Sequence, residues 1–456
     1  MKDKDFNKSV AIVGLGFGDE GKGSCLNYLY QNLDSNKYYI FEKYNGGCQG
    51  RHTVRLNNGK SFSFSQLSPS ILSADNILLL SDNFVFEPFA LFNEIDALSF
   101  LMNENKNFYF NRIYIDKNAI CVTPIHKYFN IAQEEFMGDK ARGSVGTGVS
   151  IAKFYSENSN INSDKYQVFD LVVKANDLHN ISVLKKKLRN QKDYFSEMGK
   201  LLGYDISRIE NFEYLKYIED LEFLFSNYFL NIIDIKEFYH NDNNRFVFES
   251  SQGILLDRKY GVKPNITYLD TSCDSVKEDS HKIGVIRSIY TRHGVGVFPT
   301  EDEYLEKIFN DESQEVGQFS GKLRFGWFDL ILYKYALRCA KVNEVYMTCL
   351  DYLRYLNEIN ICIGYKYNGD INQDFKRIFE YENNNDAVII KEIKCNDELL
   401  SEYLNNVTPI YDIIDLKGCT FTEIINKYVA YIMKNSDVRI GYISYGSNIN
   451  NVEVLA

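Results

Sequence analysis

Residues 10–24 read VAIVGLGFGDEGKGS, and this stretch decides the fold. The apolar run Val10–Val13 predicts a short strand, and the turn Gly14–Gly23 that follows it is dense in glycine. Apolar residues at helical spacing then predict a helix over Ser24–Asn32, and Tyr38–Phe41 predicts a second strand. A strand, a turn, a helix and a strand in this order indicate a parallel sheet. The glycines let the backbone of the turn approach phosphate oxygens closely, at a helix N-terminus that favours anions.

The rest of the chain continues this pattern. A helix is expected over Glu87–Leu101, and residues 175–240 are expected to form a charged helical insertion. Further strands are expected at Asn76–Leu80, Arg112–Asp116, Arg245–Glu249, Ile283–Tyr290, Glu344–Leu350 and Glu358–Tyr365. We therefore expect a single α/β domain over residues 1–456, with a large, mostly parallel central sheet, flanking helices, helical insertions and a P-loop-like phosphate-binding loop.

The charge and the cysteines limit the class of protein. The chain carries 51 basic against 62 acidic residues, a net charge of −11, which disfavours nonspecific nucleic-acid binding. It has no apolar run of about 18 residues, the length that a membrane-spanning helix needs. Its cysteines form no C-x-x-C pair, as is typical of reduced thiols inside a cell. We expect a soluble, cytoplasmic protein with no nucleic-acid or membrane partner.

Two general motifs fit the glycine turn only in part. Residues 16–21 satisfy the dinucleotide-binding pattern G-x-G-x-x-G. In that role Asp19 and Glu20 would place two carboxylates at the pyrophosphate, which is unfavourable. Residues 16–22 also fit the P-loop pattern G-x-x-x-x-G-K, but Gly23 occupies the position of its serine or threonine.

A third interpretation is more specific, because residues 18–23 read GDEGKG and match the G-D-E-G-K-G loop of adenylosuccinate synthetases. Other segments that resemble this family are Asn45–Thr53, Phe248–Asp257, Pro264–Thr271, Thr291–Glu301, Gly326–Asp329, Thr348–Asp351 and Pro409–Tyr411. The resemblance implies an NTP-dependent ligase of purine biosynthesis that forms a carbon–nitrogen bond. In such an enzyme the γ-phosphate of GTP activates the 6-oxo group of IMP, or of a related purine nucleotide, and L-aspartate then displaces that phosphate.

The resemblance also implies three catalytic residues. Asp19 is expected to be the base that removes the N1 proton of the 6-oxopurine, which makes O6 nucleophilic. His52 is expected to donate a hydrogen bond to the transferring phosphoryl group, and Lys22 to neutralise phosphate oxygens. A Mg²⁺ ion is expected at Asp19 and Arg51, and the family implies a homodimer.

Ligand contacts follow from the same resemblance. The expected nucleotide contacts are Gly18, Glu20, Gly21, Gly23, Gln49, Gly50, Ser144, Gln252, Thr267 and Asp351. Thr267 is expected at a 5′-phosphate, and Asp351 at the N1 and N2 donors of guanine. Thr300, Lys322 and Arg324 are expected to hold L-aspartate, since a guanidinium fork matches a carboxylate.

Several positions depart from the family pattern. Val145 replaces a phosphate-binding threonine, and Ile151–Asn162 has no counterpart of an arginine that the partner subunit contributes in the family. Cys349 replaces a lysine beside the guanine-reading aspartate, Gln49 replaces an asparagine, and Phe319–Arg324 is shorter than the family's arginine-rich loop. ATP as the donor, a deoxy or differently phosphorylated purine as the substrate, and a nucleotide sensor without turnover therefore stay open as alternatives.

Overall fold

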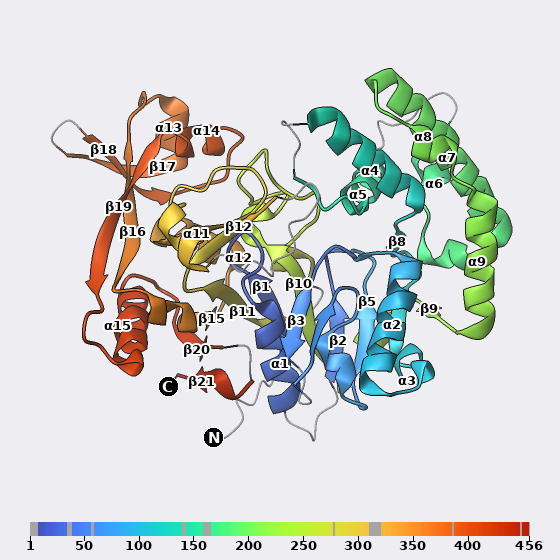
Figure 1. The fold of residues 1–456 in the computed structure, drawn as a ribbon, viewed down its shortest axis with the longest axis horizontal. Helices are drawn as coiled ribbons and strands as arrows, with labels where there is room; N and C mark the ends of the chain where they lie inside the picture. The colour runs from blue at the N-terminus through green and yellow to red at the C-terminus, as the bar shows by residue number, and fades with distance from the viewer. Residues whose placement is uncertain are drawn as a thin grey trace. The chain divides into compact units, whose positions relative to one another are not determined.

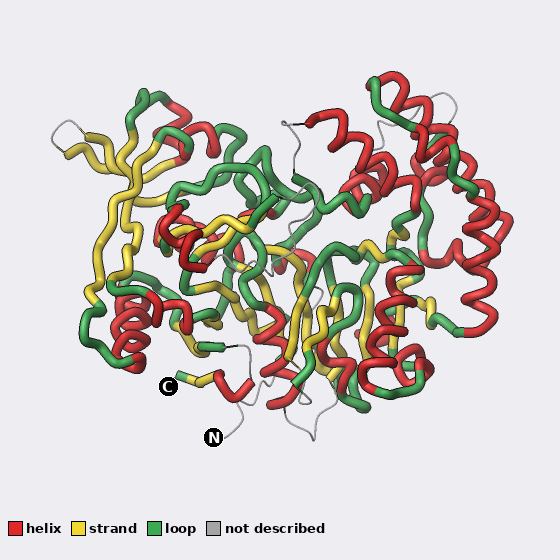
Figure 2. The backbone as a smooth tube through the Cα atoms, viewed as in Figure 1, coloured by secondary structure: helices red, strands yellow, loops and turns green. Residues whose placement is uncertain are grey.

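The computed structural model describes residues 8–33, 39–55, 59–138, 143–157, 166–276, 279–309, 321–384, 387–446 and 449–455. The fold is α/β, with a large, mostly parallel central sheet and flanking helices, as the sequence predicts (Figure 1, Figure 2). The chain divides into a first unit, Met1–Ser9 with Tyr30–Ser251, and a second unit, Val10–Leu29 with Gln252–Ala456. A single domain over the whole chain stays a prediction.

In the first unit, parallel strands pair in the order β10-β2-β5-β7-β9. These strands are β2 Tyr39–Lys43, β5 Ile77–Leu80, β7 Ile113–Asp116, β9 Asn231–Ile233 and β10 Arg245–Gly253. β5 is a run of isoleucine and leucine with its last three residues buried, as is typical of a parallel strand covered on both faces. Two smaller pairs are β3 His52–Arg55 with β4 Ser61–Phe64, and β6 Val85–Phe86 with β8 Ile120–Cys121.

Helices cover this part of the sheet and extend beyond it. They are α2 Pro88–Met102, α3 Lys106–Phe110, α4 Pro124–Met137, α5 Val149–Glu157, α6 Val168–Leu171, α7 Ile181–Leu202, α8 Ser207–Glu210, α9 Tyr214–Asn227 and α10 Lys236–Tyr239, with short 3-10 turns η1 Pro69–Leu72 and η4 Ala175–His179. α7 begins where the Asn180 side chain accepts from the Val183 N–H at 3.2 Å, and ends at Gly203, whose φ is 77°. Residues 175–240 are mainly helical, with the short strand β9 before α10, and α7 and α9 run side by side (Figure 1).

In the second unit, the strand order is β21-β20-β15-β11-β1, with β15 parallel to β11 and β20 and with β21 antiparallel to β20. These strands are β1 Ser9–Gly14, β11 Ser280–Arg287, β15 Glu344–Thr348, β20 Ile440–Ser444 and β21 Val452–Val454. The predicted strand Ile283–Tyr290 is divided, because β11 ends at Arg287 and Tyr290 opens β12. β12 Tyr290–His293 and β13 Leu323–Gly326 form an antiparallel pair.

A second sheet lies in the same unit, drawn in orange in Figure 1. It pairs β14 Phe328–Asp329, β16 Glu358–Tyr367, β18 Ala387–Ile393 and β17 Phe379–Asn384 in that order, with β19 Val407–Asp415 on β16. The helices of this unit are α1 Lys22–Asn32, which starts in it, α11 Glu303–Phe309, α12 Leu330–Ala340, α13 Gln373–Ile378, α14 Leu400–Leu404 and α15 Phe421–Lys434, with short 3-10 turns η5 Ile254–Leu256, η6 Cys273–Ser275, η7 Leu350–Tyr355 and η8 Ile449–Asn451. None of the helices in the described ranges is long and apolar enough to cross a membrane.

Candidate active site

The glycine turn links β1 to α1 in the second unit. Gly18 (φ 92°), Asp19 (φ 56°) and Gly21 (φ 86°) all have left-handed backbone. Glycine adopts this conformation freely, whereas at Asp19 it costs on the order of 1 kcal/mol. The Asp19 carbonyl accepts a hydrogen bond from Arg287 Nη1 at 3.3 Å, a contact that helps to hold the strained residue.

Glu20 points into the turn and organises it from the inside. Its Oε1 accepts from the N–H groups of Gly16 (3.1 Å) and Gly18 (2.8 Å), and the side chain is only 2% exposed. A Cβ atom at Gly14 or Gly253 would collide with this carboxylate, so close packing around Glu20 explains both glycines. The N–H groups of Gly16 and Gly18 are therefore already engaged by Glu20, and its predicted nucleotide contact stays a prediction.

Lys22 lies beneath the same turn. Its Nζ donates to Glu20 Oε2 at 2.7 Å and to the Gln252 carbonyl at 2.5 Å, and the side chain is 3% exposed. The ammonium is thus oriented by two protein acceptors at the first turn of α1. Its role toward phosphate oxygens stays a prediction.

Asp19 has the opposite orientation, since its side chain is 45% exposed. Its Oδ2 pairs with His293 Nε2 at 2.7 Å. Desolvation raises the pKa of Asp19, but the hydrogen bond and charge of His293, with the charges of Arg287 and Lys22, outweigh it and leave the pKa below its ordinary value. Asp19 therefore presents an ionised carboxylate on the outer side of the turn, whereas the Glu20 side chain points inward.

His52 opens β3 in the first unit and is 8% exposed. Its Nδ1 donates to Glu249 Oε1 at 2.6 Å, and Lys43 Nζ lies 3.1 Å from the same oxygen. Burial by itself raises the pKa of Glu249. Lys43 and His52 outweigh this effect and lower the pKa to about 2. An ionised carboxylate on Nδ1 fixes the orientation of the imidazole ring, as a partner on one ring nitrogen does in catalytic and metal-binding histidines. The catalytic role of His52 stays a prediction.

Three predicted ligand contacts carry buried polar atoms with no hydrogen-bond partner in the described residues. They are Oε1 of Gln49, Oε1 of Gln252 and Oγ1 of Thr300. Gln252 also has a left-handed backbone (φ 60°). Buried polar atoms are nearly always satisfied in native proteins, so such atoms point to a ligand or to water.

The remaining predicted nucleotide contacts have defined positions. Ser144 Oγ accepts from Asn130 Nδ2 at 3.0 Å, and the Gly50 N–H donates to the Gly47 carbonyl at 3.2 Å. The side chain of Val145 is 59% exposed and offers no hydrogen bond.

In the second unit, Gly23 is buried in the first turn of α1. Thr267 is 8% exposed, and its Oγ1 accepts from the Leu269 N–H at 3.3 Å. Asp351 lies in η7 after β15, where burial raises its pKa above the ordinary value.

The guanidinium of Arg324 is already engaged. Its Nε donates to Glu301 Oε1 at 2.6 Å, and Nη2 donates to the other oxygen of Glu301. Its Nη1 donates to the carbonyls of Gly294 (3.0 Å) and Gly296 (2.9 Å). The predicted hold on L-aspartate therefore requires Arg324 to share or exchange these partners.

The other members of the predicted amino-acid site differ in exposure. Lys322 is exposed, with Nζ 3.9 Å from Glu306, and Thr300 is fully buried. Phe319 and Ser320, at the start of the shortened loop, lie outside the described residues. The structure does not bring Lys322 and Arg324 together on one acceptor.

A magnesium ion fits Asp19 by chemistry. Mg²⁺ takes one or two carboxylates and keeps several waters, which suits an outward-facing side chain that is 45% exposed. Arg51 is a different case, because a guanidinium has no lone pair to offer and only its carbonyl oxygen can bind a metal. No group of three or more His, Cys, Asp or Glu side chains that could hold a metal occurs in the described ranges.

Sequence reasoning did not find His293, Glu249 and Arg287. A signal existed for His293, because the segment Thr291–Glu301 has histidine where the family pattern T-R-V-G-x-G has valine. Glu249 lies in the family-like segment Phe248–Asp257, but its pairing with His52 depends on a contact between distant parts of the chain.

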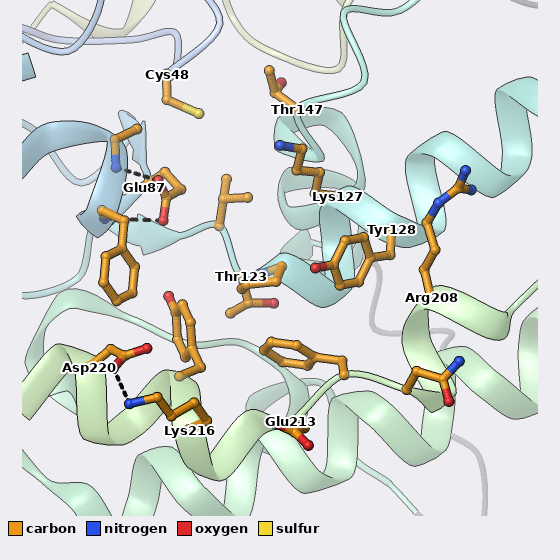
Figure 3. Close-up of a pocket in the computed structure, with 17 residues that line it drawn as sticks. Cys48, Glu87, Thr123, Lys127, Tyr128, Thr147, Arg208, Glu213, Lys216 and Asp220 are labelled. Carbon is orange, nitrogen blue, oxygen red and sulfur yellow. Dashed lines mark hydrogen bonds and ion pairs between the residues drawn. The ribbon is translucent and has the colours of Figure 1, made fainter. Parts of the chain in front are cut away.

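The first unit also contains a pocket of about 950 Å³ (Figure 3). Lys127 and Tyr128 extend into it from α4, and Glu87, at the N-terminus of α2, lies on the opposite wall (Figure 3). The Glu87 carboxylate is occupied, since it caps α2 through two backbone N–H groups. No predicted site residue lines the pocket, although Cys48, from the family-like segment Asn45–Thr53, and Thr147 do.

Comparison with known proteins assigns the family. Residues 11–452 match the family model of adenylosuccinate synthetase, so the chain belongs to the adenylosuccinate synthetase family. This is a family of ligases that form a carbon–nitrogen bond, and membership decides between the three interpretations of the glycine turn.

Curated relatives align over most of their length. The adenylosuccinate synthetase of Buchnera aphidicola subsp. Schizaphis graminum is 29% identical over 421 residues, which cover 89% of this chain and 87% of that protein. The enzyme of Pelodictyon phaeoclathratiforme is 28% identical over 472 residues, covering 98% of each. The enzyme of Chlorobium phaeobacteroides is 30% identical over 392 residues, covering 82% of this chain and 85% of that protein.

Solved structures show the same fold. The fully ligated adenylosuccinate synthetase of Plasmodium falciparum matches with a TM-score of 0.77 and 22% identity, covering 99% of this chain and 100% of that one. The succinoaminodeoxyadenylate synthetase of cyanophage S-2L, bound to dGMP and dATP, matches with a TM-score of 0.56 and 13% identity, covering 98% and 95%. At these identities the likeness extends to the fold and not to the ligands.

Proposed function

We propose that the chain activates the 6-oxo group of a purine nucleotide, IMP or a close relative, with a nucleoside triphosphate and joins the nucleotide to L-aspartate. The orientation of two neighbouring acids carries this proposal. Glu20 is turned inward and fully engaged, whereas Asp19 presents an ionised carboxylate on the outer side of the turn. Family membership supplies the reaction class, and Asp19 supplies a base where that reaction needs one.

In the proposed reaction Asp19 takes the N1 proton of the purine, and O6 attacks the γ-phosphorus as the nucleoside diphosphate leaves. The amine of L-aspartate then attacks C6, the C6–O bond breaks, and inorganic phosphate leaves as the amine loses a proton. His52, oriented by Glu249, donates to the phosphoryl oxygens as their charge develops. A Mg²⁺ ion bound at Asp19 would supply further positive charge to the phosphate oxygens.

Unsatisfied buried atoms support the ligand contacts. Gln49, Gln252 and Thr300 each offer a buried oxygen that lacks a partner in the described residues and that a bound nucleotide or amino acid can satisfy. Asp351 is proposed to read guanine, which would make GTP the donor. We extend the proposal to a homodimer, as the family pattern implies.

The experiment is phosphate release by the purified chain. We expect release only when a 6-oxopurine nucleotide, a nucleoside triphosphate and L-aspartate are all present, and a product mass that contains the aspartyl group. Asp19→Asn should reduce turnover by about 10²-fold or more. Asp374→Asn, on the exposed face of α13, is the matched control and should leave turnover unchanged.

The same assay decides between the alternatives. Because the cyanophage relative was solved with dGMP and dATP, both are tested beside IMP and GTP. Turnover with dGMP would change the substrate and keep the reaction class. If no purine, ribo or deoxy, raises phosphate release above background, the ligase proposal is wrong and a nucleotide sensor becomes the better hypothesis.

A further inference from the structure

The pair of His293 and Asp19 lies in the second unit, beside the glycine turn. His293 ends β12, and its neighbour Arg292 forms a bridge with Phe17 of the turn. His293 Nε2 lies 2.7 Å from Asp19 Oδ2, and the two side chains are 44% and 45% exposed. In the described part of the chain, His293 is the one residue whose side-chain nitrogen lies within ion-pair distance of the Asp19 carboxylate.

Asp19 is therefore held at two points. Arg287 binds its carbonyl oxygen, which fixes the strained backbone, and His293 binds one carboxylate oxygen, which fixes the rotation of the side chain. Because the two oxygens of a carboxylate are rigidly linked, a contact that fixes Oδ2 also fixes the direction of Oδ1. An exposed carboxylate without such a partner would rotate among its χ2 positions, because that torsion is broad.

The segment that carries His293 is itself clamped by two arginines. Arg292, 1% exposed, donates through Nη1 to the Val297 carbonyl at 2.8 Å and through Nη2 to the Asn265 carbonyl at 3.1 Å. Its guanidinium also lies 4.2 Å from the centre of the Phe17 ring.

Arg324 holds the same turn from the neighbouring strand. Its Nη1 donates to the carbonyls of Gly294 and Gly296, whose φ values of 71° and 116° favour glycine. The backbone that follows His293 is thus fixed on both sides, which is the requirement for a side chain that positions another group.

We propose that His293 is a positioning residue for Asp19: its Nε2–H holds one carboxylate oxygen, so that the other is presented to the purine N1–H. The proposal rests on the function proposed above. It goes beyond that function because the family pattern has valine at this position, and a valine side chain has no hydrogen-bond donor that could hold Asp19. It also gives Arg292 and Arg324 a defined role, which is to hold the segment that presents His293.

The test compares His293→Val with His293→Gln. Valine removes the donor, whereas glutamine keeps an N–H that can reach Asp19. We expect His293→Val to lower kcat by about tenfold, the effect of losing about 1.4 kcal/mol of orientation, with KM values for nucleotides and aspartate changed little. His293→Gln should recover most of kcat.

Two controls keep the outcome decisive. His281→Gln removes a histidine that pairs with Glu344 at 2.7 Å elsewhere in the second unit, and it should leave kcat unchanged. Thermal melting followed by Trp327 fluorescence checks that each variant folds, because Trp327 is the single tryptophan and is buried.

The outcomes separate this proposal from the proposed function. If Asp19→Asn loses turnover and His293→Val keeps the wild-type kcat, the positioning role is wrong and the ligase stands. If His293→Val raises KM at constant kcat, or if glutamine rescues no better than valine, His293 does not act through its hydrogen bond to Asp19. If Asp19→Asn keeps its turnover, the assignment of the base itself fails.

Discussion

Replacing Glu20 with glutamine tests whether the glycine turn is organised from the inside. The Glu20 carboxylate accepts two backbone N–H groups and the Lys22 ammonium, and neither side chain is more than 3% exposed. Glutamine keeps the size but removes the charge, so the buried Lys22 faces an amide. Breaking a buried ion pair in this way costs about 3–5 kcal/mol, because the remaining charge is left uncompensated. We expect the free energy of unfolding of the second unit to fall by about 4 kcal/mol.

Urea unfolding followed by Trp327 fluorescence measures this loss, since Trp327 lies in the second unit and is 2% exposed. With a urea m value of about 3 kcal/mol/M, the midpoint should fall by about 1.3 M. Adding Lys22→Met should recover part of the loss, because no unpaired charge then remains. The control is Glu303→Gln, whose exposed pair with Lys307 contributes little. If the Glu20→Gln midpoint moves no further than that of the control, the turn does not depend on its internal carboxylate.

Three further predictions concern the first unit, and circular dichroism measures each. Gly46→Ala should destabilise the unit by about 1–3 kcal/mol, because φ is 92° and the added Cβ would overlap the Ser251 side chain; a melting temperature equal to that of wild type contradicts this. Burial lowers the pKa of His126 from 6.5 to about 3, so the folded state resists protonation and stability should fall by about 1.4 kcal/mol per pH unit as the pH drops below 6.5. His126→Gln should flatten that slope, and an unchanged slope would exclude His126 as its source. The pKa of Glu249, lowered to about 2 by Lys43 and His52 against the effect of burial, makes its stabilisation complete above about pH 4.5 and lost as the pH falls toward 2. Glu249→Gln should therefore be less stable at pH 7 and less sensitive to acid, and equal stability at pH 7 contradicts this.

The identity of the glycine turn could be predicted because its determinants are local. An apolar strand, glycines at positions that need left-handed backbone and a helix start all lie within residues 10–24. The central strands were found for a similar reason, since parallel strands buried on both faces leave continuous apolar runs in the sequence. The edge strands β17 and β19 carry mixed, partly exposed sequences, which is why the sequence does not predict them.

The neighbouring residues Asp19 and Glu20 show a feature that the sequence does not predict, namely which of two adjacent acids faces solvent. Both are acids in one turn, and the motif predicts that both are important, yet nothing in their order says which one faces solvent. That choice depends on the N–H groups of Gly16 and Gly18, on the ammonium of Lys22 and on the close approach of Gly253, which arrives from the far end of β10.

Arg324 and His293 make the same point about function. A lone arginine in a family-like loop predicts a carboxylate ligand, but in the structure the guanidinium of Arg324 donates to Glu301 and to two backbone carbonyls. His293 stands where valine is expected, and only the pairing of β12 with the glycine turn brings its ring to Asp19. The sequence determined the family, the strand–turn–helix unit and the candidate base, because these depend on residues close together in the chain. The tertiary structure decided which groups are free to meet a ligand, because hydrogen bonds between distant segments determine which donors and acceptors are already used.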